Sequence, residues 1–261
     1  MFKFCSLYSG SSGNSSLIQT NNTKILVDAG VSCKKIVDAL NSINIQPSEI
    51  EAILITHEHS DHTNGVGLFS KKYNIPVYAN IETWDAMPSQ KNKLDEKNIK
   101  FFKFDKFKIG DLTILPFSIP HDAANPCGFN IYNEDKKISI ATDIGHITTE
   151  VLDKLNNSSF LLLESNYDLN TLKCSRYPYP LKQRISGPNG HLSNDDAGKT
   201  ISYLAEHGLN KVMLGHLSRE NNFPELAYKT VVEQLINNNV NHDFSLTVAD
   251  RYNVSPMIDI G

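Results

Sequence analysis

Three histidines and one aspartate stand close together just after the apolar run Ala52–Ile55. The run predicts a buried strand, and the small polar residues and glycines that follow the histidines predict that a helix starts there. His57 and His59 are two residues apart, so in an extended chain they project to the same side. Asp61 and His62 would lie in the first turn of the helix and can face a second point nearby. Because imidazole and carboxylate are the usual ligands of zinc and similar divalent ions, this spacing offers one pair of ligands to each of two ions.

Three later residues share this setting. His121, Asp143 and His216 each follow an apolar run that predicts a strand, and each precedes a loop of small residues. A single histidine of this kind is more often a hydrogen-bonded core or surface residue. Together with the first cluster, however, they make seven candidate ligands at strand ends, and seven ligands that share one carboxylate suit a two-metal site. A helical His-Glu-x-x-His protease site is excluded, because the histidines do not have that spacing.

The elements that must position these residues are mostly strands, with helices between them. The sequence has no glycine-rich βαβ fingerprint and no repeat of fixed period. Two sheets packed face to face, with helices on their outer faces, are the simplest arrangement of such elements. The chain has 261 residues, 40% of them apolar, which suits one large core, so we expect a single domain over residues 1–261.

Composition narrows the functional class. The formal net charge of -4 provides no global basic field, so a polyanion would have to be held by a local patch or by metal. Cys5, Cys33, Cys127 and Cys174 are scattered without a Cys-x-x-Cys pair, which argues against a disulfide framework and a zinc ribbon. Since no segment approaches the length that spans a membrane, we expect a protein of the reducing cytoplasm without membrane association. Its oligomeric state is left open.

The order of the ligands, His-x-His-x-Asp-His and then a histidine, an aspartate and a histidine, resembles the metallo-β-lactamase superfamily. The resemblance implies an α+β fold, an αββα sandwich with a binuclear metal site at one edge of the sheets. It implies two ligand triads and a bridging carboxylate: His57, His59 and His121 on one ion, Asp61, His62 and His216 on the other, and Asp143 between them. It further implies a hydroxide held between the ions as the nucleophile. Zinc is the expected metal, and a carboxylate bridge also accommodates manganese or iron.

Single positions discriminate among branches of the superfamily. His59 stands where redox-active diiron members of the superfamily look to have glutamate, so hydrolysis is favoured over electron transfer. Asp143 stands where true β-lactamases look to have cysteine, so antibiotic hydrolysis is not expected. Between Asp143 and His216 lie the 72 residues 144–215, too few for the inserted domain of the β-CASP nucleases. The sequence also lacks the long glycine-proline arm that members which process the 3′ end of tRNA look to have.

A finer resemblance, nearly end to end, is to the YycJ/WalJ group of small metallohydrolases. It is carried by five segments: Ser9-Gly10-Ser11-Ser12-Gly13-Asn14-Ser15, Tyr177-Pro178, Leu181-Lys182 with Arg184-Ile185, Gly190-His191-Leu192-Ser193-Asn194, and Gly215-His216-Leu217-Ser218-Arg219-Glu220-Asn221-Asn222. The group implies cleavage of phosphodiester bonds in nucleic acid, mainly as a 5′-to-3′ exonuclease on DNA. The alternatives are hydrolysis of a small ester, thioester or cyclic phosphodiester, and a non-catalytic regulatory module, which would not need every ligand.

Residues 169–194 form a basic segment in an acidic protein. The segment contains no acidic residue, and two tyrosines stand among its four cations, which are Lys173, Arg176, Lys182 and Arg184. Arginine suits phosphate geometry and tyrosine stacks on bases. We therefore assign Arg176, Lys182 and Arg184 to substrate binding. The alternative is that the segment is an ordinary solvated loop. We expect residues 165–193 to be irregular, and a loop of that length suggests function.

Four further residues complete the candidate site. His191 could protonate the leaving oxygen or hold the scissile phosphate, with Glu164 orienting it, so we count His191 and Asp61 as catalytic. The alternative for His191 is a hydrogen bond to the backbone at a helix start. Asn14 is a candidate phosphate contact, although a structural turn is the favoured explanation of its loop. Arg219 follows a ligand closely and could contact phosphate or form a salt bridge.

Overall fold

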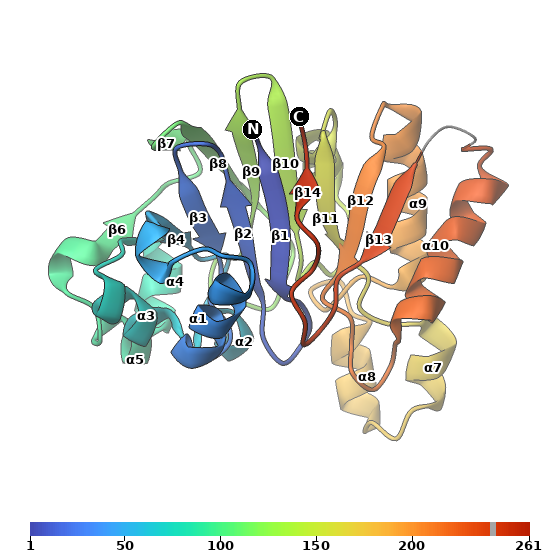
Figure 1. Ribbon diagram of the computed structural model, residues 1–261. Coiled ribbons are helices and arrows are strands. Elements are labelled where there is room, and N and C mark those ends of the chain that lie inside the picture. Colours follow the sequence, from blue (N-terminus) through green and yellow to red (C-terminus); the bar gives the residue numbers. More distant parts are fainter. Residues whose placement is uncertain (241–243) are drawn as a thin grey trace.

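Two seven-stranded sheets form the centre of the computed structural model, which describes residues 1–240 and 244–261 (Figure 1). The strand order of the first sheet is β14-β1-β2-β3-β4-β5-β6, and that of the second is β13-β12-β11-β10-β9-β8-β7. The strands of the first sheet are β1 Lys3–Tyr8, β2 Ser15–Gln19, β3 Lys24–Val27, β4 Ala52–Leu54, β5 Val77–Ala79, β6 Ile99–Phe101 and β14 Ile258–Asp259. Those of the second are β7 Phe107–Ile109, β8 Leu112–Ser118, β9 Cys127–Asn133, β10 Lys136–Ala141, β11 Phe160–Glu164, β12 Lys211–Gly215 and β13 Ser245–Val248.

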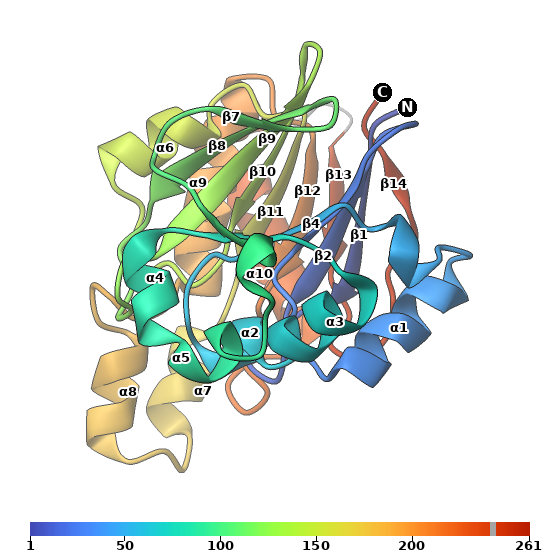
Figure 2. The ribbon, with the colours of Figure 1, turned by 90° about the vertical axis from the view of Figure 1, so that its left-hand side faces the viewer.

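Helices cover the outer face of each sheet (Figures 1 and 2). The first sheet is covered by α1 Cys33–Ser42, α3 Val66–Tyr73 and α4 Ile81–Ala86, with the short α2 Ser60–Thr63 and α5 Pro88–Lys91 beside them. The second is covered by α6 Thr149–Leu155, α9 Asn194–Glu206 and α10 Pro224–Asn237. The predicted αββα sandwich is thus confirmed. Among the described residues, no helix combines the length and apolarity needed to cross a membrane.

Both faces of each sheet are buried, because successive side chains of a strand point alternately to the core between the sheets and to the helices. In β3, Ile25 and Val27 face the core between the sheets, whereas Leu26 faces the helices. In β11, Phe160 and Leu162 face inward and Leu161 and Leu163 face the helices. Successive side chains of a strand point to opposite faces, so a strand covered on both faces must be apolar throughout.

The parallel strands bring distant loops to one edge of the sandwich. β3, β4 and β5 are parallel neighbours in the first sheet, as are β10, β11 and β12 in the second. Parallel neighbours end at the same edge, so the residues that follow β3, β4, β10 and β12 lie together there. Asp28, residues 56–62, Asp143 and His216 follow these four strands.

The expectation that residues 165–193 are irregular is wrong. This segment contains α7 Leu169–Cys174 and α8 Tyr179–Ile185, which extend beyond the sheets at the edge of the candidate site (Figures 1 and 2). The Asp168 side chain caps α7 by accepting a hydrogen bond from the backbone amide of Thr171 (2.7 Å), and a proline in the first turn starts α8. Short helices with such caps leave little apolar periodicity, so proline content alone suggested a loop.

Candidate metal centre

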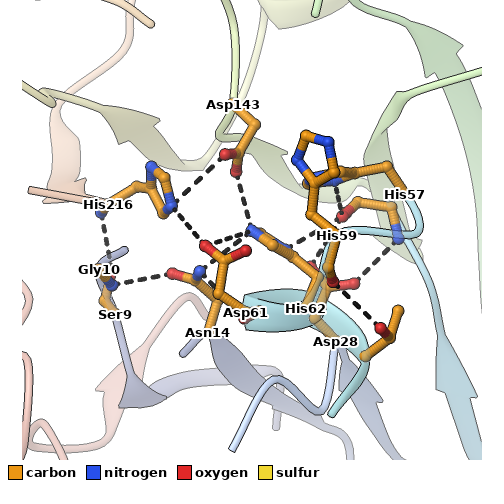
Figure 3. Close-up of polar contacts among 12 residues, drawn as sticks. Ser9, Gly10, Asn14, Asp28, His57, His59, Asp61, His62, Asp143 and His216 are labelled. Carbon is orange, nitrogen blue, oxygen red and sulfur yellow. Dashed lines mark hydrogen bonds and ion pairs between the residues drawn. The ribbon is translucent and has the colours of Figure 1, made fainter. Parts of the chain in front are cut away.

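All seven predicted ligands converge at this edge of the sandwich, and all of them except His121 are labelled in Figure 3. Their nitrogen and oxygen atoms form overlapping groups in which all ligand atoms lie within 4.8 Å of one another: His57 with His59 and His121, Asp61 with His62 and His216, and Asp143 with His57 and His62. The first two groups are the two predicted triads. Asp143 belongs to a group that joins them, which is the place expected of a shared carboxylate.

The chain orients the first triad through the ring nitrogens that do not face it. His121 donates from Nδ1 to the carbonyl of Gly190 (3.0 Å), and Nδ1 of His57 lies 3.0 Å from the hydroxyl of Thr56. His59 instead presents Nδ1, which lies 3.4 Å from Nε2 of His121. Nε2 of His57 is buried without a hydrogen-bond partner among the described residues. A buried nitrogen with a free lone pair, within 4.8 Å of ring nitrogens of two other histidines, fits a metal ligand.

The second triad is oriented by two buried carboxylates. His62 donates from Nδ1 to Asp28 (2.7 Å), and His216 donates from Nδ1 to Glu164 (2.8 Å). Their Nε2 atoms face the carboxylate of Asp61, at 3.7 Å from His62 and 3.4 Å from His216. Histidine ligands of metals commonly donate their second N–H to a carboxylate or carbonyl, so these contacts fix the expected tautomers.

Asp143 lies between the triads in a conformation that L-residues rarely adopt. Its backbone φ is 58°, and its carboxylate lies 3.1 Å from Nε2 of His62, 3.4 Å from Nε2 of His216 and 3.8 Å from Nε2 of His121. Asp28 and His216 share the positive φ, at 61° and 53°. Left-handed backbone at three strand ends of one site is strain of the kind that functional sites hold.

The buried carboxylates of the site are stabilised by nearby positive charge. Burial disfavours the charged form of His216, yet Asp143, Asp61 and Glu164 raise its pKa to about 10. The pKa of His62 is likewise raised well above its ordinary value against burial, by Asp143 and Asp28. In the protein alone, protons on these rings balance the buried carboxylates, and bound cations would do so in their place. The donor set and its charge therefore fit divalent metal ions.

Sequence reasoning missed several buried residues that hold the ligands. Asp28 accepts from the backbone amide and the hydroxyl of Thr56 (2.9 Å each) as well as from His62. The Ser9 hydroxyl accepts from the backbone amide of His216 (2.9 Å), as Figure 3 shows, and Asn166 donates to the His216 carbonyl (2.8 Å). Asp28 carried a usable signal, because it ends a strand and precedes small residues just as Asp143 does.

Glu164 connects His191 to the ligands, as the sequence suggested. Its Oε1 accepts from Nδ1 of His191 and of His216, both at 2.8 Å, and its Oε2 accepts from the backbone amides of Ile144 (2.8 Å) and Leu192 (3.0 Å). Burial alone would raise the pKa of Glu164, but the two histidines lower it to about 2. The His191 ring stacks on that of His216, with a centroid distance of 5.3 Å, so His191 lies at the mouth of the site.

We expect Glu164→Gln to lower the free energy of unfolding by about 2–3 kcal/mol and hydrolysis by about 10- to 100-fold. Each oxygen of Glu164 accepts two N–H groups, so the amide nitrogen of glutamine must face two donors in either orientation. Urea unfolding and turnover of the metal-loaded protein measure both effects. The exposed Glu206→Gln is the control, and unchanged stability of Glu164→Gln would contradict this account.

The structure uses Asn14 within its own turn. Its Oδ1 accepts from the amide of Gly10 (2.9 Å), and its Nδ2 lies 3.0 Å from Nε2 of His62 and 3.3 Å from the Asp61 carbonyl (Figure 3). The backbone packs so closely that a Cβ on Gly30 would lie 1.6 Å from the Asp61 carbonyl oxygen. These contacts favour the structural turn over direct phosphate contact by Asn14.

The candidate cations lie on two segments of the chain, residues 176–184 and the loop after β12. Arg176 is exposed, and Lys182 donates to the carbonyl of Lys173 (2.6 Å) on the α7–α8 side. Arg184 donates from Nε to Asp122 (2.5 Å), which neighbours the ligand His121. Arg219 lies beyond His216 with 72% of its side chain exposed, 3.9 Å from Glu220. Arg176 and Arg219 are therefore open to solvent, whereas Arg184 is partly committed to an ion pair.

The sandwich and its cluster of histidines and aspartates define a class of metal-dependent hydrolases. The family model of the metallo-beta-lactamase superfamily matches residues 8–195, and this chain belongs to that superfamily, within the YycJ/WalJ group. It is 43% identical over 237 residues to the exodeoxyribonuclease WalJ of Streptococcus pneumoniae, covering 90% of this chain and 88% of that protein. It is 36% identical over 234 residues to the exodeoxyribonuclease YycJ of Bacillus anthracis, with coverage of 89% and 88%.

A solved structure shares the fold. The metallo-beta-lactamase fold protein YhfI from Bacillus subtilis superimposes with a TM-score of 0.72, covering 97% of this chain and 98% of that chain. The sequences are 16% identical, so the comparison supports the architecture and says nothing of the substrate.

Proposed function

We propose that this protein is a metal-dependent exonuclease that hydrolyses the phosphodiester bonds of DNA from the 5′ end. The observation that carries the proposal is the pair of ligand triads joined by Asp143 at one edge of the sandwich. The relatives named exodeoxyribonucleases match this chain over about nine-tenths of its length, which supports DNA as the substrate. The buried acidic residues of the site are consistent with metal-dependent chemistry on an anionic bond.

The residues present would hold two divalent ions. His57, His59 and His121 would bind one, Asp61, His62 and His216 the other, and Asp143 both. Such ions activate water and stabilise the charge that develops on the attacked and leaving oxygens. We propose zinc, since imidazole and carboxylate ligands suit it, while the shared carboxylate also accommodates manganese or iron.

His191 is the proposed general acid. Glu164 accepts from its Nδ1, which leaves Nε2 as the ring nitrogen that can deliver a proton to the leaving oxygen. Its side chain is 20% exposed, in contrast to the buried ligand His216, so a substrate can reach it. Asp61 shares the catalytic assignment, because its side chain is 24% exposed whereas that of Asp143 is 2% exposed.

The α7–α8 pair provides a surface for the strand. A cavity of about 540 Å³ is lined there by Tyr177, Tyr179, Lys173 and Lys182, and Tyr179 is 70% exposed. Cations with exposed aromatic rings are the usual platform for single-stranded nucleic acid. We propose that the DNA strand crosses this platform on its way to the metal centre.

Digestion of end-labelled DNA by the metal-loaded protein tests the proposal. We expect a 5′-labelled strand to release its label as the first product, whereas a 3′-labelled strand shortens progressively. Chelation should abolish both reactions and added zinc or manganese should restore them. A mock purification controls for contaminating nucleases.

A parallel panel of RNA, cyclic phosphodiesters, esters and thioesters addresses the competing substrates. Turnover of a small ester, thioester or cyclic phosphodiester with no cleavage of DNA would overturn the proposal.

We also propose a cytoplasmic location for the protein. The four cysteines are all free, which is consistent with a reducing compartment, and a DNA-cleaving protein would act where DNA is found.

A further inference from the structure

A second cavity, separate from the α7–α8 platform, opens beside the ligand His216. It has a volume of about 250 Å³, and its lining includes Ser9, Leu217, Arg219, Phe223, Arg251 and Tyr252. Two of its walls are tied to the centre: Ser9 accepts the backbone amide of His216, and Arg251 donates from Nη2 to the carbonyl of Leu217 (2.6 Å). The cavity thus begins one residue away from a candidate metal ligand.

Two positive charges at this cavity lack a strong anionic partner. Arg251 forms no ion pair within the described part of the chain, and its Nη1 lies against Gly10 without a hydrogen-bond partner there. Asp250 is the one carboxylate among the described lining residues, and it accepts from the backbone amides of Tyr252 (2.7 Å) and Asn253 (2.8 Å) and from the Asn253 side chain (3.2 Å). Among the described residues, Arg219 pairs only with the exposed Glu220, at 3.9 Å. Two guanidinium groups in this setting create a local positive field.

The charges of the two arginines act on each other. Burial lowers the pKa of Arg251, the charge of Arg219 lowers it further, and Tyr252 and Asp250 oppose this. Arginine remains protonated at neutral pH. A bound anion would relieve the repulsion between the two guanidinium groups, and Arg219 is exposed enough to contact it directly.

Exposed aromatic rings border the same cavity. Phe223 is 52% and Tyr252 is 58% exposed, so both rings are open for a base to stack on them. The volume is below the range of about 300–1,000 Å³ that is common for drug-sized ligands, so the space suits a single nucleotide. Aromatic faces with a positive field match the two parts of a nucleotide, its base and its phosphate.

We propose that this cavity binds one nucleotide of the DNA substrate next to the scissile phosphate, through residues other than those that line the α7–α8 cavity. This inference rests on the proposed function. The base stacks on Tyr252 and Phe223, and the phosphate contacts Arg219 within the field of Arg251.

Kinetics on single-stranded oligonucleotides test the subsite. We expect Tyr252→Ala to raise KM about tenfold, and Arg219→Gln to reduce the salt dependence of kcat/KM by about 0.7 in slope, as for one phosphate contact on a single strand. Arg219→Lys should restore the slope, because it keeps the charge. Both losses should exceed those on a chromogenic phosphodiester that has no second nucleotide.

Matched controls come from residues that do not line the cavity. Tyr203→Ala removes another exposed tyrosine, and Lys229→Gln removes an exposed cation that lies 3.8 Å from a glutamate, much as Arg219 does. Thermal unfolding checks that each variant is folded. If the wild type digests DNA and the cavity variants behave like the controls, the subsite is refuted and the nuclease proposal stands. If the wild type hydrolyses only small substrates, both fail.

Discussion

The Asp143→Asn variant is expected to lose at least about a thousandfold in DNA hydrolysis and to retain no more than about one divalent ion per chain. Asp143 lies 3.1 Å from Nε2 of His62 and 3.4 Å from Nε2 of His216, between the triads. Asparagine tolerates the φ of 58° that the backbone has there, so the variant removes charge with little change of shape. Elemental analysis and end-labelled digestion measure the two effects.

The control for Asp143→Asn is Asp153→Asn, which removes an exposed carboxylate from α6. Its metal content and activity should equal those of the wild type. Two ions and full activity in Asp143→Asn would refute the assignment of a shared carboxylate. Loss of one ion with full activity would show that a single triad suffices for the reaction.

The His191→Ala variant should hydrolyse DNA about a hundredfold to a thousandfold more slowly than the wild type, with its metal content unchanged. His191 bonds Glu164 and belongs to neither predicted triad, although its ring lies in a further group of possible ligands with Asp143, Glu164 and His216. The deficit should be much smaller on a p-nitrophenyl phosphodiester, because that leaving group departs without a proton. Glu164 keeps its bond to His216 in this variant, so the fold should be preserved.

Substrate comparison makes the His191 prediction specific. An equal deficit on DNA and on the p-nitrophenyl diester would exclude a general-acid role and point to positioning instead. Loss of metal from His191→Ala would place His191 among the ligands. The exposed His207→Ala serves as control, since His207 directly follows α9, bonds the Tyr203 carbonyl and stacks on the Tyr203 ring.

The sequence predicted the layers of the fold because the residue types along each strand indicate which faces of that strand are buried. The alternation in β3 and β11, with apolar residues on both faces, already indicates sheets covered on both sides. The approach failed over residues 165–193, where α7 and α8 are too short for periodicity to show.

Local sequence patterns did not predict the contacts between distant parts of the chain. Glu164 was expected to orient His191, but its equal bond to His216, 52 positions away, was not foreseen. Arg184 was expected to meet substrate, and the fold places it against Asp122, 62 positions away. Neither residue carries a local mark of its partner, since strand register and loop path decide which side chains meet.

The amino-acid order alone determined the chemistry of this protein: which donors exist, how they are spaced, and that each stands where a strand ends. Only the tertiary structure decided which buried groups orient them, namely Asp28, Glu164 and Ser9, and that Arg219 and Arg251 share a cavity beside His216. The physical reason is that ligand type is a property of single side chains. Orientation, burial and charge compensation, by contrast, arise only when strands from two sheets bring residues such as Ser9 and His216, 207 positions apart, into contact.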